Sequence, residues 1–255
     1  MMTLLSLGLS SSLVANAEPV FAATQGGGLN LSYLLIIGGI TLLSWIVSST
    51  MKRRFAEHSQ VPMPMTGAEV AQKMLRDHGI TDVEVLSTPG YLSDHYDPMK
   101  KTVNLSEPVY HMANAAAAAV AAHECGHAVQ HKQAYKWLTF RSKMVPAVQF
   151  ASQMQRYLMM MFFFGLFYTG SLWMLWAMVG TLAVIAGFSL VTLPVEFDAS
   201  RRAMAWIDRS GLSGRMENDR ARNALFWAAM TYVVGAIGAL AQLAYWLMLL
   251  LGRRD

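Results

Sequence analysis

Cysteine and charge are both scarce in this chain. Cys125 is the only cysteine among 255 residues, so an internal disulfide and a thiolate metal cluster are both excluded. Any bound metal must therefore use His, Asp or Glu ligands. Charged residues make up 14% and hydrophobic residues 54% of the sequence, which is typical of a membrane protein. The formal net charge of +4 is too small to indicate a nucleic-acid partner.

The N-terminal segment has a signal-like pattern without the usual positive charge. An apolar run at 4–14 is followed by small-residue sites at 15–17 and 22–23, but no Lys or Arg precedes the run. Because secretory signals begin with a basic region, we interpret residues 1–30 as a signal-like or disordered segment. The predicted fold starts after it.

Long uncharged segments predict four transmembrane helices. Residues 31–50 are uncharged and long enough to span a bilayer core. The strictly apolar residues 157–193 would form about 55 Å of a single helix against a core of about 30 Å, so they must fold back. Residues 147–193 are therefore predicted to form a hairpin of two helices that turns near 169–171 and ends at Pro194. Residues 224–251 form the last span.

The distribution of basic residues predicts the topology. Of the 20 Lys and Arg residues, 11 lie in 52–146 and 6 in 194–223. By the positive-inside rule both polar segments face the cytoplasm. The chain is thus predicted to be a mainly α, multi-pass protein of the cell membrane. A small α+β domain at 51–146 and a helical segment at 194–223 would both face the cytoplasm.

Local patterns predict the elements of the segment 51–146. Thr66 and Glu69 are spaced as a capping box, and Gly79 follows as a stop signal, so a helix is expected at 66–78. Strands are expected at 83–86 and 101–105, with a turn-rich stretch at 91–98 between them. We expect the second strand to pair with an extended substrate by edge addition.

The sequence His123-Glu124-Cys125-Gly126-His127 contains the pattern His-Glu-x-x-His. Four residues turn a helix by about 400°, so the two imidazoles lie on one face, as two ligands of a zinc ion must. Glu124 lies beside them, where it can take a proton from a metal-bound water. The alanine-rich run at 115–122 favours a helix here. That helix begins either at Ser106 or again at Asn114, and it ends near Lys132.

A third ligand must come from elsewhere in the chain. His131 would lie about 12 Å from His123 along the helix, too far for ligands that are each about 2 Å from one ion. It is therefore at best a neighbour, and more simply an exposed residue near the helix end. Gln130 and Gln133 occupy positions where the metzincin pattern needs Gly and His, which excludes that class. Glu196 is the strong candidate, because a hairpin returns the chain to the face that it left.

Asp198 and Cys125 each allow two interpretations. Asp198 either orients a ligand imidazole or forms a salt bridge to Arg201 or Arg202. Cys125 is interpreted as a small side chain packed behind the ligand helix rather than as a redox sensor.

Several motifs together resemble those of the YugP-like neutral zinc metallopeptidases of bacterial membranes. The resemblance covers about residues 31–250 and rests on residues 92–98, 123–131, 193–200 and 231–234. The chain is more distantly similar to the HtpX and CAAX-type membrane proteases, which share the order of zinc helix, membrane hairpin and glutamate ligand. The resemblance implies His123, His127 and Glu196 as Zn²⁺ ligands and Glu124 as the catalytic base. In those relatives an aspartate usually follows the glutamate by four residues, whereas this chain has Ser200, which leaves that supporting role unfilled or passed to Asp198.

The segment 51–146 is thus predicted to be a zincin-like metalloprotease domain, and 194–223 is predicted to supply the third ligand of a cytoplasmic active site. The predicted function is hydrolysis of peptide bonds in membrane-associated or unfolded protein substrates at the cytoplasmic membrane surface. The predicted partners are a peptide or protein substrate and the lipid bilayer, with no nucleic acid, and the oligomeric state stays open. A donor to the developing oxyanion is needed, and the unranked candidates are His95, Tyr96, Arg201 and Arg202.

The sequence disfavours two alternatives to a surface protease. A non-catalytic membrane scaffold or assembly factor with structural zinc would need a closed fourth coordination position, and no fourth ligand is evident in the sequence. Intramembrane proteolysis would need the motif inside a bilayer span, but polar segments flank only about ten apolar residues there, against about 20 for a span.

Overall fold

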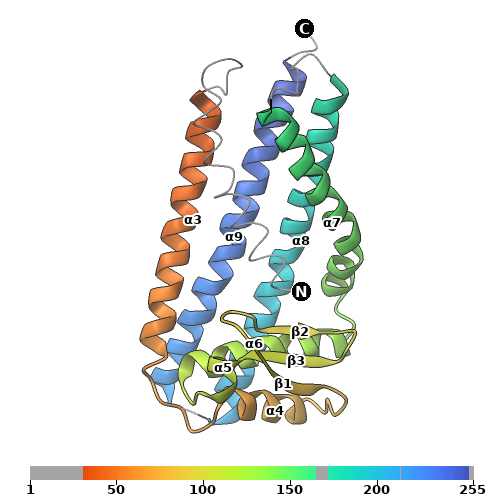
Figure 1. The fold of residues 1–255 in the computed structure, drawn as a ribbon. Coiled ribbons are helices and arrows are strands. Elements are labelled where there is room, and N and C mark those ends of the chain that lie inside the picture. The colour runs from red at the N-terminus through yellow and green to blue at the C-terminus, as the bar shows by residue number, and fades with distance from the viewer. Residues whose placement is uncertain (1–30, 165–171, 213, 253–255) are drawn as a thin grey trace.

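The computed structural model describes residues 31–164, 172–212 and 214–252, and it is mainly helical with one small sheet. Four long helices stand side by side, and the remaining elements gather at one end of them (Figure 1). The long helices are α3 (Leu31–His58), α7 (Lys136–Phe163), α8 (Leu172–Ser210) and α9 (Arg215–Leu251). The smaller elements are α4 (Gly67–Asp77), β1 (Glu84–Thr88), β2 (His95–Asp97), β3 (Thr102–Ser106), α5 (Glu107–His111) and α6 (Ala115–Lys132).

Three of the long helices can cross a membrane by length and composition. Their candidate spans are Tyr33–His58, Leu172–Ser210 and Met216–Leu251. The helix α7 is as long as α3 but does not qualify, because amide and arginine side chains interrupt its apolar sequence. Three of the four predicted spans therefore correspond to helices that are long and apolar enough to cross a membrane, and the fourth stays a prediction.

The predicted boundaries of the hairpin were wrong at two places. The helix α7 begins at Lys136, well before residue 147, and α8 continues through Pro194 to Ser210. Proline in a helix interior removes one hydrogen bond, but tertiary packing compensates here. The polar half of α8 buries Val195, Glu196, Asp198, Ala199, Ala203, Trp206 and Ile207. The helix ends at Ser210, and Gly211 follows it with φ +64°. The predicted turn at 169–171 lies outside the described residues.

The sheet has the order β1-β3-β2, with β1 parallel and β2 antiparallel to β3. The predicted strands at 83–86 and 101–105 correspond to β1 and β3, whereas β2 lies in the stretch expected to form only turns. Because β3 is central, both of its edges are occupied, and the expected substrate pairing with 101–105 is wrong. In Figure 1, β2 is the strand of the sheet that lies nearest to those ends of the long helices that point away from the small domain.

Capping residues set the helix starts in this domain. Thr66 and Glu69 form the predicted capping box of α4. Ser106 precedes the short helix α5. A new helix, α6, then begins after Asn114, whose Oδ1 accepts a hydrogen bond of 2.8 Å from the amide of Ala117. The helix α6 ends at Lys132, as predicted.

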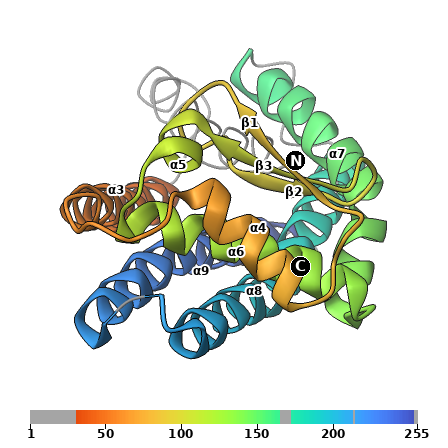
Figure 2. The same ribbon diagram turned by 90° about the horizontal axis from the view of Figure 1, so that it is seen from below.

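The helix α6 lies in the centre of the domain, in contact with α4, α8, α9 and the sheet (Figure 2). Its alanines are almost all buried, because small side chains let neighbouring elements approach from every side. The motif helix is therefore a core element, and the side chains of His123, Glu124 and His127 are buried in the protein interior.

Candidate metal centre

The structure brings His123 and His127 of α6 together with Glu196 of α8, and the ligand atoms all lie within 4.8 Å of one another. Nε2 of His123 is 3.3 Å and Nε2 of His127 is 3.6 Å from Oε2 of Glu196. Ligand atoms about 2 Å from a tetrahedral ion lie roughly 3.3 Å apart. The donor types and their spacing therefore fit a zinc ion with three protein ligands.

Both imidazoles are oriented through their Nδ1 atoms. His127 Nδ1 lies 3.0 Å from Oε1 of Gln130, and His123 Nδ1 lies 3.1 Å from Oγ of Ser200. An amide oxygen only accepts, so Nδ1 of His127 carries the proton and Nε2 is left with its lone pair. Such partners fix the ring and the tautomer of a metal-ligating histidine.

Ser200 therefore occupies the place that the sequence left open. Its hydroxyl supports His123, so the supporting role is neither unfilled nor passed to Asp198. The carboxylate of Asp198 instead accepts a hydrogen bond of 2.9 Å from Nε2 of Gln130, and it also binds the guanidinium groups of Arg201 and Arg202. Asp198 thus reaches His127 only through Gln130.

Gly126 allows the two halves of the site to meet. A Cβ at this position would lie 2.6 Å from the carbonyl oxygen of Ala199, so α6 and α8 approach each other too closely for any side chain. The neighbouring Cys125 points the other way, with Sγ 3.5 Å from the carbonyl oxygen of Ala71. It is fully buried, which agrees with the predicted packing role.

Glu124 is buried beside the three clustered side chains. Its Oε2 accepts a hydrogen bond of 3.1 Å from the backbone amide of Tyr96 in β2. Burial raises the pKa of Glu124 to about 7, against the opposing effect of His123 and with a further increase from the carboxylate of Asp94. A carboxylate with a pKa near neutrality can accept a proton and release it again.

Asp94 fixes the strand that covers Glu124. Its carboxylate accepts hydrogen bonds from the amide of Ser106 at 2.8 Å and from the hydroxyl of Ser106 at 3.0 Å. These bonds join the start of β2 to the end of β3. The three-residue strand is thereby held with the amide of Tyr96 directed at Glu124.

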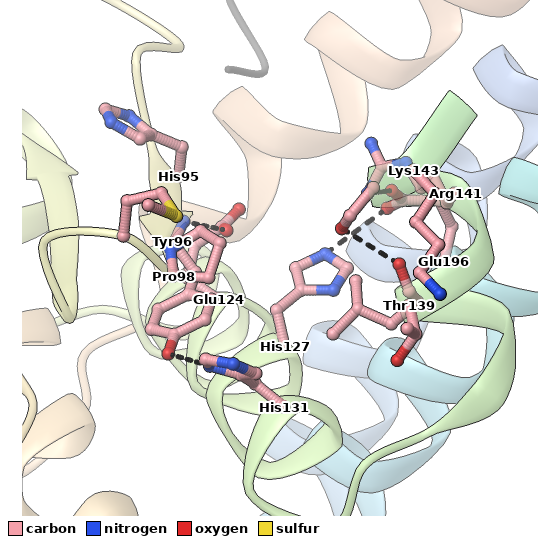
Figure 3. Close-up of a pocket in the computed structure, with 13 residues that line it drawn as sticks. His95, Tyr96, Pro98, Glu124, His127, His131, Thr139, Arg141, Lys143 and Glu196 are labelled. Carbon is pink, nitrogen blue, oxygen red and sulfur yellow. Dashed lines mark hydrogen bonds and ion pairs between the residues drawn. The ribbon is translucent and has the colours of Figure 1, made fainter. Parts of the chain in front are cut away.

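A cavity of about 360 Å³ opens onto this cluster. One wall is the segment of β2 and its following turn, the opposite wall is the first part of α7, and α6 lies between them (Figure 3). The lining residues are His95, Tyr96, Pro98, Met99, Glu124, His127, His131, Leu138, Thr139, Arg141, Ser142, Lys143 and Glu196.

Arg141 is a site residue that the sequence did not reveal. Its Nη1 lies 3.4 Å from Oε1 of Glu196, its side chain is only 8% exposed, and its Nε has no hydrogen-bond partner among the described residues. In Figure 3, Arg141 and Glu124 lie on opposite sides of His127. The sequence signal was weak, because Arg141 is one of three cations, with Lys136 and Lys143, just before the predicted hairpin.

The four sequence candidates for an oxyanion donor are divided by the structure. His95 and Tyr96 line the cavity, whereas Arg201 and Arg202 bind Asp198 and do not line it. His131 is not part of the cluster of ligand atoms. Its Nδ1 lies 2.8 Å from the hydroxyl of Tyr96, so it is a residue of the cavity rim rather than merely an exposed residue.

Fold and site together define a class: a helical membrane protein whose small α+β domain brings two histidines and a glutamate together as a candidate metal centre. The chain belongs to the family described as "Putative neutral zinc metallopeptidase", whose model matches residues 33–251. It is similar to the "Putative membrane protease YugP" of Bacillus subtilis (strain 168), with 38% identity over 227 residues that cover 88% of this chain and 99% of that protein. No solved structure matches the chain. The family resemblance noted from the motifs is therefore confirmed, and family membership implies zinc as the ion of this site.

Proposed function

We propose that this chain is a membrane-bound zinc metalloendopeptidase that hydrolyses peptide bonds at the cytoplasmic membrane surface. The observation that carries the proposal is the buried cluster of His123, His127 and Glu196, with Glu124 beside it and a cavity open to it. We assign the first three residues as zinc ligands and Glu124 as the catalytic base.

The side chains of the cavity supply the proton transfers. A zinc ion held by the three ligands would polarise the scissile carbonyl and lower the pKa of a bound water to near 7. Glu124 takes a proton from the attacking water and passes it to the leaving amine. The guanidinium of Arg141, on the other side of His127, donates hydrogen bonds to the carbonyl oxygen as negative charge develops on it.

We propose that the outer edge of β2 positions the substrate. Among the described strands β2 is an edge strand, and its residue Tyr96 contacts Glu124. An extended chain can add to such an edge through main-chain hydrogen bonds. The scissile bond would then lie between the base on the β2 side and Arg141 on the α7 side. In this arrangement the domain holds its substrate beside the metal ligands and the base, as we propose for a zincin-like domain.

We propose a cytoplasmic site at the membrane surface, with α7 as a fourth span. The ends of α3, α8 and α9 that adjoin the domain carry the basic residues, including Lys52, Arg53, Arg54, Arg201, Arg202 and Arg209, and a positive end is cytoplasmic. The helix α7 has 28 residues, enough to span a bilayer core, and it leads from the cavity toward the distal end of the bundle. Substrates would be loops, tails or unfolded segments of proteins near this surface.

The alternative of a scaffold with structural zinc has less support. Within the described residues, the cluster of candidate ligand atoms contains three side chains, without a fourth His, Cys, Asp or Glu. A structural zinc site normally has four protein ligands, whereas a catalytic site keeps one position open. The cavity beside the cluster fits the second case.

The direct test measures zinc content and peptide cleavage on the same purified protein. The wild type should contain one zinc ion per chain and cleave a mixture of unfolded polypeptides. The Glu124→Gln variant should keep the zinc and lose the cleavage. Undiminished cleavage by this variant would reject Glu124 as the base.

A further inference from the structure

The helix α7 has an exposed polar face that the proposed chemistry does not use. Ser142, Gln149, Gln153 and Arg156 are all exposed. Their spacing places them within about 60° of one another around the helix axis. We call these four residues the α7 polar face.

Hydrogen bonds between α7 and α8 indicate how deep in the bilayer the C-terminal part of the α7 polar face lies. Gln155 Oε1 accepts a hydrogen bond of 2.6 Å from Thr181 Oγ1, and Gln155 Nε2 lies 2.9 Å from Met178 Sδ. Both partners lie near the middle of the apolar part of α8, which runs from Leu172 to Pro194. With α7 as the proposed fourth span, Gln153 and Arg156, which flank Gln155, lie near the middle of the hydrocarbon layer.

A charged group at this depth needs a polar neighbour. Arg156 Nη2 donates a hydrogen bond of 3.3 Å to Gln153 Oε1, and Gln153 Nε2 donates one of 3.2 Å to the hydroxyl of Tyr157. The amide of Gln153 is therefore partnered within α7, whereas the guanidinium of Arg156 keeps further N–H donors. Arginine and amide groups that face lipid are energetically costly, and in membrane proteins they usually mark a functional contact. A purely lipid-facing role for the α7 polar face is therefore disfavoured.

The lower end of this face joins the candidate active site. Ser142 lines the cavity together with Thr139 and Arg141. Arg156 lies about 21 Å further along the helix. The exposed face of α7 thus extends from Arg156 to the catalytic cavity, with the exposed Pro146 between Ser142 and Gln149.

We propose that the α7 polar face docks the transmembrane segment of a substrate protein. That segment would carry a carboxylate or amide side chain near mid-membrane, where it pairs with Arg156 and Gln153. The chain that leaves the membrane beside Ser142 would then enter the cavity. This inference rests on the proposed function and narrows its substrate class to proteins with a membrane segment.

A second copy of this chain is a poorer occupant of the same face. Two copies related by a twofold axis normal to the membrane would place both Arg156 side chains at the same depth. Like charges facing each other in a medium of low dielectric repel strongly. A substrate segment with an acidic or amide residue instead supplies a complementary group.

The test uses the full-length protein in proteoliposomes with designed single-span substrates. Each substrate has a leucine–alanine membrane segment and the same cytoplasmic reporter tail, and its central residue is Asp, Leu or Lys. The free tail serves as a soluble substrate. The variants are Arg156→Met and Gln153→Leu. The matched control is Phe150→Leu, which changes an exposed residue of the same helix outside the polar face.

Wild type should cleave the Asp substrate about tenfold faster than the Leu substrate, as expected for one interhelical polar contact. Arg156→Met should remove this difference and cleave the free tail at the wild-type rate, and Phe150→Leu should behave as wild type. Equal cleavage of the Asp, Leu and Lys substrates by wild type would overturn the proposal.

A second readout does not depend on cleavage. The photoreactive residue p-benzoylphenylalanine is placed at position 149, which lies on the same face and leaves Arg156 and Gln153 intact, in the Glu124→Gln background. Preferential adducts with the Asp substrate support docking even if the wild type cleaves nothing, in which case only the proposed function fails. Equal adducts with all three substrates, or adducts mainly between two copies of this chain, would reject the docking role.

Discussion

The hydroxyl of Ser200 lies 3.1 Å from Nδ1 of His123, and this contact joins the motif helix to the helix that carries Glu196. It places a neutral group against Nδ1 of a candidate ligand. The hydroxyl orients the imidazole and raises its basicity less than a carboxylate would, because it bears no charge. Zinc affinity should therefore be sensitive to this position in both directions.

Replacing Ser200 tests this relationship. Ser200→Ala should lower zinc affinity by about 10- to 100-fold, the usual effect of removing a partner of a ligand histidine. Ser200→Asp should bind zinc at least as tightly as wild type. Competition with a fluorescent chelator measures both. Equal affinities in all three proteins would show that the contact does not support the ligand.

Gly126 is expected to be intolerant of any side chain. The methyl group of Gly126→Ala would collide with the backbone of Ala199, and such overpacking typically costs about 1–3 kcal/mol. Thermal unfolding in detergent should show a lower midpoint together with weaker zinc binding. The control is Gly180→Ala, because a Cβ there meets nothing within 4 Å. Similar behaviour of the two variants would contradict the close approach of α6 and α8.

Arg141 is expected to act mainly on the rate of the chemical step. Arg141→Met removes the proposed donor to the oxyanion, and loss of one such donor typically lowers kcat by about 10²- to 10³-fold. Zinc content and KM should change little, and Arg141→Lys should recover part of the rate. A large loss of zinc with an unchanged rate per bound zinc would instead indicate that Arg141 only positions Glu196.

The raised pKa of Glu124 predicts a pH-dependent stability of the zinc-free protein. Burial raises the pKa in the folded state to about 7 from a usual value of 4.5. The folded state therefore binds more protons than the unfolded state between these values, and stability falls as the pH rises from about 4.5 to 7. The loss is at most about 3 kcal/mol for a shift of this size.

Denaturant unfolding of zinc-free protein at several pH values measures this effect. The Glu124→Gln variant should show a flatter dependence over the same pH range, because its side chain does not titrate. A wild-type protein with the same pH profile as the variant would show that Glu124 is not buried in its uncharged form.

The local sequence pattern predicted the two histidines of the site, and the membrane topology predicted its glutamate. The spacing of His123 and His127 is a property of any helix, so it could be read from the sequence. Glu196 could be placed beside them because an even number of membrane crossings returns the chain to the same side. Neither inference needed knowledge of side-chain packing.

The details that the sequence did not reveal all depend on long-range contacts. The strand β2 is three residues long and exists because β3 and the bonds between Asp94 and Ser106 hold it. The continuation of α8 past Pro194 depends on packing against α6. Arg141 and Ser200 became site residues only when α7 and α8 were placed around the motif helix.

Zinc analysis of the Glu196→Ala variant tests the central claim most directly. If Glu196 completes the site that His123 and His127 begin, purified wild type contains one zinc ion per chain. The variant should then lose most of its zinc during dialysis against a weak chelator. Full retention of one zinc ion per chain by Glu196→Ala would contradict a metal centre shared between α6 and α8.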